Sequence, residues 1–235
     1  MTDRRKRYFY DTIAGDYDRI INRYDLERRL EIVFDELLGS GDLAGKRVLD
    51  VGAGTGWFSE QAARAGAIVT STDIGINMLR QTRGRTGTML VASDACDLAL
   101  ASNTFDVVLS SECIEHTPDP LRALREMCRV LRQPGVLVVT TPNRLWHFSA
   151  VIAERFKLRP YDGLENWVGW RDLRGAVEGA GLQVTTMRGF HLVPPLFKPL
   201  WRPLRAIDRL GAVVGPLMLN VAFRAEKRPL AGGTP

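Results

Sequence analysis

The chain has 235 residues, of which 45% are hydrophobic and 25% charged, and three of them are cysteines. These proportions exclude a collagen-like fibre, a disordered tail protein and a small disulfide-stapled domain. The cysteines form neither a CxxC metal pair nor an even set for disulfides, so we expect a reducing, cytoplasmic location.

The formal net charge of +5 is unevenly distributed along the chain. Residues 1–7 carry a net +3 and residues 194–235 a net +5, so the body between them is acidic. This distribution does not indicate a nucleic-acid partner, for which we would expect a basic stripe on one recognition element. An acidic small molecule or an anionic lipid surface fits better. The longest uncharged stretch, residues 210–223, is too short to span a membrane.

Taken in chain order, the first predicted element is a segment rich in aromatic and charged residues, 8–24, which we expect to fold as a lid. An amphipathic helix over 26–38 follows. From about residue 46 to 141, apolar β-type runs alternate with helical stretches, as in βαβ units with a parallel sheet. The expected strands are 47–51, 67–72, 88–92, 105–110 and 136–140, and the expected helices are 57–65, 76–83 and 121–131, the last ended by Gly135.

Beyond residue 142 the alternation fades, and the sequence predicts a helix over 171–179 and strands over 182–187 and 217–224. Between these strands, the basic amphipathic stretch 195–210 is interpreted as a cap over a pocket or as a peripheral membrane contact.

These elements together predict a Rossmann-like, doubly wound α/β fold. We expect a mostly parallel seven-stranded sheet with an antiparallel last strand. The expected parts are a lid and helix over 1–40, a cofactor-binding core over 41–145, and a substrate-pocket region over 146–235.

A glycine-rich sequence, VLDVGAGTG, follows the first expected strand at residues 48–56. Glycines at this point let the backbone approach a ligand closely. The spacing is GxGxG rather than the GxGxxG of dinucleotide sites, and Asp50 precedes the glycines. A carboxylate there suits a ligand with an amino or sulfonium charge. The alternative is a plain tight turn between strand and helix.

Carboxylates also follow the next two expected strands. Asp73 lies 21 residues after Gly52, where an acidic side chain accepts hydrogen bonds from ribose hydroxyls; the alternative is a cap for the next helix. Asp94 ends the third strand and suits an adenine amine. Three carboxylates at three successive strand ends favour a cofactor that carries a nucleoside.

With these motifs, the chain resembles the class I S-adenosylmethionine-dependent methyltransferases over about residues 8–145. The segment FYDTIAGDYD is similar to the N-terminal lid of the ubiquinone- and menaquinone-biosynthesis enzymes of this family. The resemblance implies S-adenosylmethionine as methyl donor and S-adenosylhomocysteine as product. The other similar segments are VLDVGAGTG, STDIGINML, ASDACDLAL, FDVVLSSECIEHTPDP and LRQPGVLVVTTPN.

The resemblance also implies roles for individual residues around the cofactor. The methionine part is assigned to Asp50, Gly52, Ala53, Gly54 and Gly56, the ribose to Asp73, the adenine to Ile74, Met78, Asp94 and Ala95, the border of the sulfonium to Ser110 and Ser111, and lid closure to Tyr17.

His116, just beyond the fourth expected strand, is the candidate general base because imidazole titrates in the useful range. The alternative is that it only orders its loop. The histidines have no metal-ligand spacing, so we expect no metal. The acceptor pocket is assigned to Asn143, His147, Trp167, Trp170 and His191, with core packing or another structural role as the competing interpretation.

The sequence therefore predicts methylation of a small-molecule or lipid-like acceptor, first of all on oxygen with His116 as base. The alternatives are C- or N-methylation of a quinone-like or natural-product acceptor, a nicotinamide-dependent oxidoreductase, and a non-catalytic cofactor-binding protein. The oligomeric state is left open.

Overall fold

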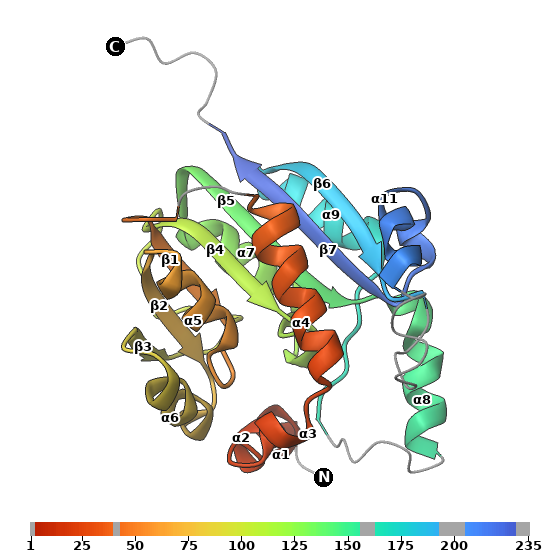
Figure 1. The fold of residues 1–235 in the computed structure, drawn as a ribbon, viewed down its shortest axis with the longest axis horizontal. Coiled ribbons are helices and arrows are strands. Elements are labelled where there is room, and N and C mark those ends of the chain that lie inside the picture. Colours follow the sequence, from red (N-terminus) through yellow and green to blue (C-terminus); the bar gives the residue numbers. More distant parts are fainter. Residues whose placement is uncertain (1–2, 40–42, 156–162, 193–204, 229–235) are drawn as a thin grey trace.

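The computed structural model describes residues 3–39, 43–155, 163–192 and 205–228. Seven strands form one sheet in the order β3-β2-β1-β4-β5-β7-β6 (Figure 1). The first five strands are parallel, whereas β7 runs antiparallel to both β5 and β6. The predicted fold class is confirmed. The strands are Arg47–Val51 (β1), Ile68–Asp73 (β2), Met89–Ala92 (β3), Phe105–Ser111 (β4), Leu131–Pro142 (β5), Gln183–Phe190 (β6) and Asn220–Lys227 (β7).

Helices cover both faces of this sheet (Figure 1). The side chains of β1 alternate between two hydrophobic cores, because Leu49 packs in one cluster and Val48 in the other. The Leu49 cluster includes α7 (Pro120–Val130) and α9 (Trp170–Gly179), and the Val48 cluster includes α4 (Arg23–Glu31), the following π-helical turn η1 (Ile32–Leu37) and α5 (Trp57–Arg64). Burial on both faces explains why the strands read as continuous apolar runs.

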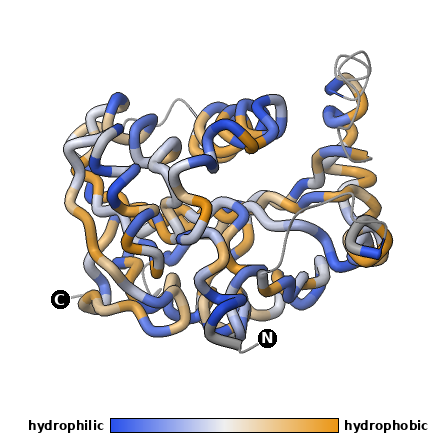
Figure 2. Tube along the Cα trace, turned by 90° about the horizontal axis from the view of Figure 1, so that it is seen from below, coloured by the Kyte–Doolittle hydropathy of each residue, from blue (hydrophilic) through white to orange (hydrophobic). Residues whose placement is uncertain are grey.

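Ten further helices and helical turns lie in the described residues. Hydrophobic and hydrophilic residues are interspersed along the helices (Figure 2), as expected where one side of a helix packs on a core. In the described part of the chain, no helix is both long and apolar enough to cross a membrane. These helices are α1 (Asp3–Arg7), α2 (Phe9–Thr12), α3 (Tyr17–Ile20), α6 (Ile76–Arg85), η2 (Ile114–His116), η3 (Arg144–Trp146), α8 (His147–Arg155), η5 (Asp208–Leu210), α11 (Gly211–Val214) and η6 (Gly215–Leu217).

Several predicted boundaries were wrong, and three cases have a clear structural reason. The helix predicted over 121–131 ends at Val130, and the chain does not turn at Gly135, because β5 already begins at Leu131, which pairs with Phe105. The last strand lies three residues later than predicted, since 215–217 form a helical turn and β7 pairs along its whole length with β5. The helix predicted from residue 26 begins at Arg23, because the Asn22 side chain caps the amides of Tyr24 and Asp25. Of the predicted stretch 195–210, residues 195–204 lie outside the described residues.

Candidate active site

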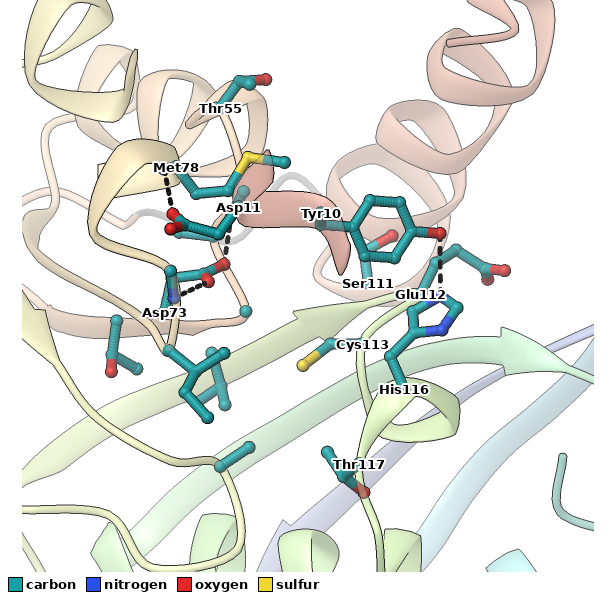
Figure 3. Close-up of a pocket in the computed structure, with 18 of the residues that line it drawn as sticks. Tyr10, Asp11, Thr55, Asp73, Met78, Ser111, Glu112, Cys113, His116 and Thr117 are labelled. Carbon is teal, nitrogen blue, oxygen red and sulfur yellow. Dashed lines mark hydrogen bonds between the residues drawn. The ribbon is translucent and has the colours of Figure 1, made fainter. Parts of the chain in front are cut away.

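A cavity lies at the carboxyl ends of β1, β2, β3 and β4, on both sides of the point where the strand order reverses (Figure 3). In open α/β sheets this point is where ligands bind. The cavity measures about 1050 Å³ including the solvent at its mouth. The predicted residues that line it are Tyr17, Gly52, Ala53, Gly54, Asp73, Ile74, Met78, Asp94, Ala95, Ser111 and His116.

The loop after β1 forms one wall with its backbone. The amides of Gly52 and Ala53 donate to the carbonyl of Thr72 at 2.8 and 2.9 Å, so the loop is tied to the end of β2. Gly52 and Gly54 have φ values of 73° and 56°, which favour glycine. A Cβ at Gly52 would lie 2.2 Å from Cys113 Sγ, whereas a Cβ at Gly54 would meet no atom within 4 Å. Gly54 therefore leaves open space for a ligand against the backbone.

Asp73 connects this loop to the beginning of α6. Its Oδ2 accepts from the Gly54 amide at 3.0 Å and its Oδ1 from the Gly75 amide at 2.8 Å. Burial raises the pKa of this carboxyl, although the bonds from these amides oppose the shift. Each carboxylate oxygen keeps a second acceptor position, which suits a pair of hydroxyls.

Asp94, at the end of β3, places a second carboxylate in the cavity. Its Oδ1 accepts from the Cys96 amide at 2.9 Å, and its Oδ2 lies 2.5 Å from Arg7 Nη2. Arg7 belongs to the N-terminal segment and lines the cavity, so the chain itself supplies the cation that pairs with this carboxylate.

Residues 3–20, which contain α1, α2 and α3, cover the cavity and are called the lid below. Asp11 of the lid accepts from the Asn77 amide at 2.6 Å and from the Met78 amide at 3.4 Å (Figure 3). It also approaches Gly75 so closely that a Cβ there would lie 2.7 Å from Asp11 Oδ1. Gly75 has no side chain to cap α6, and the Asp11 carboxylate takes over that function from another segment.

A second contact fixes the lid near α3. Asp18 accepts from Thr55 Oγ1 at 2.7 Å and from Trp57 Nε1 at 3.0 Å, and it forms an ion pair with Arg85. The Trp57 ring, which also lines the cavity, is contacted by the guanidinium groups of Arg85 and Arg23, 3.6 and 4.7 Å from its centroid.

His116 faces the lid from η2. Its Nε2 lies 3.2 Å from the hydroxyl of Tyr10 (Figure 3), and the two ring centroids are 4.8 Å apart. Its Nδ1 lies 2.9 Å from the carbonyl oxygen of Leu164. Glu115 Oε1 is 3.7 Å from Nε2, and burial raises the pKa of Glu115 well above its usual value. The imidazole is therefore held at both nitrogens beside the cavity.

Two charged residues that the sequence reasoning missed also line the cavity. Arg29, buried on α4, donates to Ser111 Oγ at 3.1 Å and to Asp25 Oδ2 at 2.9 Å. Glu112 accepts from Thr140 Oγ1 at 3.1 Å, and its pKa is raised to about 7 by burial and by the charge of Asp25, against the effect of Arg29. A buried arginine in an amphipathic helix has the same sequence pattern as one on a solvated face, so no signal was available for Arg29.

Three predicted cofactor residues lie beneath the cavity wall rather than on it. Asp50 is 2% exposed and accepts from Ser59 Oγ at 2.6 Å, and burial raises its pKa to about 7. Ser110 donates to the Val51 carbonyl at 2.9 Å. Gly56 packs against Thr82, where a Cβ would lie 2.9 Å from Cγ2. These residues support the loop and the strand ends from below.

The five residues predicted for the acceptor pocket are also not on the cavity wall. The Asn143 side chain donates to the carbonyls of Pro216 and Met218 at 2.9 and 3.0 Å. His191 is fully buried, with Nε2 3.1 Å from Asp25 Oδ1. His147 contacts Trp167 at 5.5 Å between ring centroids, and Trp170 packs against the core.

Known proteins similar to this chain identify its family. The family profile "Methyltransferase domain" matches residues 49–139. A demethylmenaquinone methyltransferase of Renibacterium salmoninarum is 36% identical over 55% of this chain and 58% of that protein. A ubiquinone biosynthesis O-methyltransferase of Aeromonas salmonicida is 33% identical over 71% of this chain and 74% of that protein. The chain belongs to the S-adenosylmethionine-dependent methyltransferases.

Solved structures show the same fold for the methyltransferase. A SAM-dependent methyltransferase from Thermotoga maritima superposes with a TM-score of 0.69 at 19% identity, covering 94% of this chain and 98% of that one. The [4+2]-cyclase SpnF superposes with a TM-score of 0.62 at 23% identity, covering 86% and 80%. The predicted family, enzyme class and cofactor are confirmed, and the nicotinamide and non-catalytic alternatives are set aside.

The cavity of the methyltransferase fits S-adenosylmethionine. Gly54 leaves the space that a ligand needs against the loop, and Asp73 and Asp94 present acceptor oxygens at two neighbouring strand ends. Thr72 Oγ1, at the end of β2, is buried without a hydrogen-bond partner among the described residues, as expected of a group that awaits a ligand. These are the residues that would hold the cofactor.

Proposed function

We propose that this methyltransferase methylates a hydroxyl oxygen of a small-molecule or lipid-like acceptor, with His116 accepting the hydroxyl proton. The observation that carries the proposal is the contact between His116 Nε2 and the Tyr10 hydroxyl, 3.2 Å apart at the cavity. A nitrogen that already binds a phenolic hydroxyl is in position to bind the hydroxyl of an acceptor. The name of the Aeromonas relative, a ubiquinone biosynthesis O-methyltransferase, supports the same reaction.

The chain's own residues have three tasks in this reaction. When bound, S-adenosylmethionine supplies a reactive methyl group on a sulfonium, so the acceptor oxygen chiefly needs alignment and the loss of its proton. Asp73 and Asp94 accept hydrogen bonds from the cofactor's ribose and adenine, the lid with Tyr10 and Tyr17 excludes water, and His116 takes the proton at Nε2. Burial raises the pKa of Tyr17 to about 12, so its hydroxyl stays neutral.

The experiment is an acceptor screen with a defined product analysis. The enzyme is incubated with S-adenosylmethionine and with phenols, catechols, hydroquinones and aryl amines, each with and without an isoprenoid tail. NMR of the methylated product identifies the atom that carries the new methyl group. We expect O-methyl products only. A methyl group on carbon or nitrogen would overturn the proposal of O-methylation and favour C- or N-methylation of a quinone-like acceptor.

The base is tested separately with His116→Gln. We expect kcat for a phenolic acceptor to fall by at least a hundredfold, while the Kd for S-adenosylhomocysteine stays the same. A variant that keeps its kcat would show that His116 is not the base, whatever atom is methylated.

We further propose a cytoplasmic enzyme with a peripheral lipid contact. Seven of the eleven exposed large hydrophobic side chains in the described residues lie on two neighbouring segments, and this apolar patch supports such a contact. The segments are linked by the Trp146 indole, which donates to the Leu217 carbonyl at 2.8 Å. The patch consists of Leu145, Phe148, Val151, Ile152, Leu210, Val213 and Leu217.

A further inference from the structure

Residues 164–166, which precede α9, cross the loop that carries His116. Three hydrogen bonds connect the two segments. The Leu164 carbonyl oxygen lies 2.9 Å from His116 Nδ1, the Asn166 amide donates to the Glu115 carbonyl at 2.7 Å, and the Asn166 side chain donates to the Thr117 carbonyl at 2.7 Å. Asn166 therefore binds the residues directly before and after His116.

The partner of Nδ1 determines which nitrogen of the neutral imidazole carries the proton. A carbonyl oxygen can only accept a hydrogen bond, so Nδ1 must donate to Leu164. In the neutral ring, Nε2 then has the free electron pair. Nε2 is the atom that faces the cavity and the Tyr10 hydroxyl, which must therefore donate to it. The tautomer needed for a base at Nε2 thus follows from a backbone carbonyl in a distant segment.

Asn166 holds the Leu164 carbonyl opposite the His116 ring. Leu164 is two residues away, and both hydrogen bonds of Asn166 end on the backbone that flanks His116. At its other end, the segment is held by Val168, whose carbonyl accepts from the Arg144 amide at 3.2 Å. Loss of the Asn166 side-chain bond would loosen the segment where it meets the His116 loop.

We propose that Asn166 is a positioning residue that keeps His116 in the Nδ1–H tautomer, and that the Tyr10 hydroxyl marks the place of the acceptor's hydroxyl. The catalytic relevance of this tautomer rests on the proposed function of His116 as base. Tyr10 belongs to the lid, so its hydroxyl leaves Nε2 when an acceptor hydroxyl arrives. The hydroxyl of the acceptor therefore competes with the Tyr10 hydroxyl for His116 Nε2.

The tautomer is read by NMR on the full chain labelled with ¹⁵N-histidine, using the two-bond correlations between ring protons and nitrogens. The chain has three histidines, and the spectrum of His116→Gln assigns the signals of His116. We expect Nδ1–H in the wild type, and a mixture of both tautomers in Asn166→Ala and Asn166→Asp. Asn103→Asp, a substitution of an asparagine outside the cavity lining, is the matched control. An Nε2–H wild type would overturn the proposal.

Kinetics separate positioning from a structural role. We expect Asn166→Asp to lower kcat at least tenfold with an unchanged KM for S-adenosylmethionine, and Asn166→Gln, which keeps an amide donor, to restore part of the loss. Tyr10→Phe should lower the acceptor KM severalfold, because the competing hydroxyl is gone. An unchanged tautomer and kcat in Asn166→Asp would refute the role of Asn166, and an unchanged or higher acceptor KM in Tyr10→Phe would refute that of Tyr10. The NMR measurement does not depend on catalysis. It therefore still tests the role of Asn166 if His116→Gln keeps its activity and the proposed base is wrong.

Discussion

Arg7 and Asp94 form an ion pair across the cavity, with Nη2 and Oδ2 2.5 Å apart and side-chain exposures of 28% and 32%. The other oxygen of Asp94 accepts from the Cys96 amide, so each oxygen already has one donor and keeps one further acceptor position for a ligand. Asp94 is also the residue assigned to the adenine amine. The ion pair with Arg7 therefore weakens this carboxylate as an acceptor for the adenine amine without blocking it.

Removing this ion pair should strengthen cofactor binding. A partly exposed ion pair contributes at most about 1 kcal/mol, so we expect Arg7→Gln to lower the Kd for S-adenosylhomocysteine by up to about fivefold. Isothermal titration calorimetry measures the effect, with Arg5→Gln, an exposed arginine outside the cavity lining, as control. A weaker Kd in Arg7→Gln would instead mean that Arg7 contacts the ligand.

The loop glycines allow a test that separates binding from folding. Gly54 and Gly45 both have positive φ, 56° and 72°, and a Cβ at either would meet no protein atom within 4 Å. Alanine should therefore cost each site a similar strain, about 1 kcal/mol of unfolding free energy. Only Gly54 lines the cavity, so Gly54→Ala should weaken cofactor binding at least tenfold and Gly45→Ala should not. Equal Kd values for the two variants would contradict the assignment of the loop.

Asp73 is expected to contribute strongly to cofactor affinity. A hydrogen bond to a charged group contributes about 1.5–3 kcal/mol, so Asp73→Ala should raise the Kd for S-adenosylhomocysteine by about tenfold or more. Asp97→Ala, at an exposed aspartate outside the cavity lining, is the control. The titration is paired with thermal unfolding, since Asp73 also binds the Gly54 and Gly75 amides. An unchanged Kd would refute its role at the ribose.

The pKa of Glu112, about 7, predicts a pH-dependent preference between the two adenosyl ligands. Above pH 7 the carboxylate is charged and attracts the sulfonium cation of S-adenosylmethionine, and below pH 7 it is protonated and this attraction is lost. S-adenosylhomocysteine has a neutral sulfur. The ratio of the Kd of S-adenosylhomocysteine to that of S-adenosylmethionine should therefore rise severalfold from pH 6 to pH 8. Glu112→Gln should remove most of this pH dependence of the Kd ratio. An equally strong pH dependence in that variant would assign the effect to another group.

The apolar patch on α8 predicts binding to anionic vesicles. Phe148 and Ile152 are 56% and 50% exposed, and replacing both with serine should lower the fraction that cosediments with phosphatidylglycerol vesicles at least threefold. Ile68→Ser, at a residue 63% exposed on β2 and not part of the patch, serves as the control. If the wild type stays in the supernatant, the proposed lipid contact is wrong.

The sequence predicted the central sheet because its strands are buried on both faces and therefore read as continuous apolar runs. The prediction of the strand boundary failed at Leu131, because an apolar residue after a helix fits another helical turn as well as the first position of a strand. The strand-end residues Asp73 and Asp94 were predictable because parallel strands place their carboxyl ends at one edge. Contacts such as that of Asp11 with Asn77 join segments far apart in the chain and leave no periodic signal.

The residues that contact the acceptor are harder to predict from the sequence than those that hold the cofactor. Aromatic residues such as Trp170 are compatible with a ligand pocket and with a core, and only three-dimensional packing decides between them. The sequence predicts that Tyr10 lies in a lid, but its contact with His116 depends on how that lid folds over the sheet.

Trp57 makes the lid observable without a chemical label. Its indole nitrogen donates to Asp18 of the lid, and its ring contacts two guanidinium groups beside the cavity. Opening of the lid would remove the hydrogen bond and expose the ring to water, which shifts tryptophan emission to longer wavelengths. A variant with phenylalanine at the other four tryptophans would thus carry an intrinsic fluorophore at the lid's anchor, suited to following closure by stopped flow.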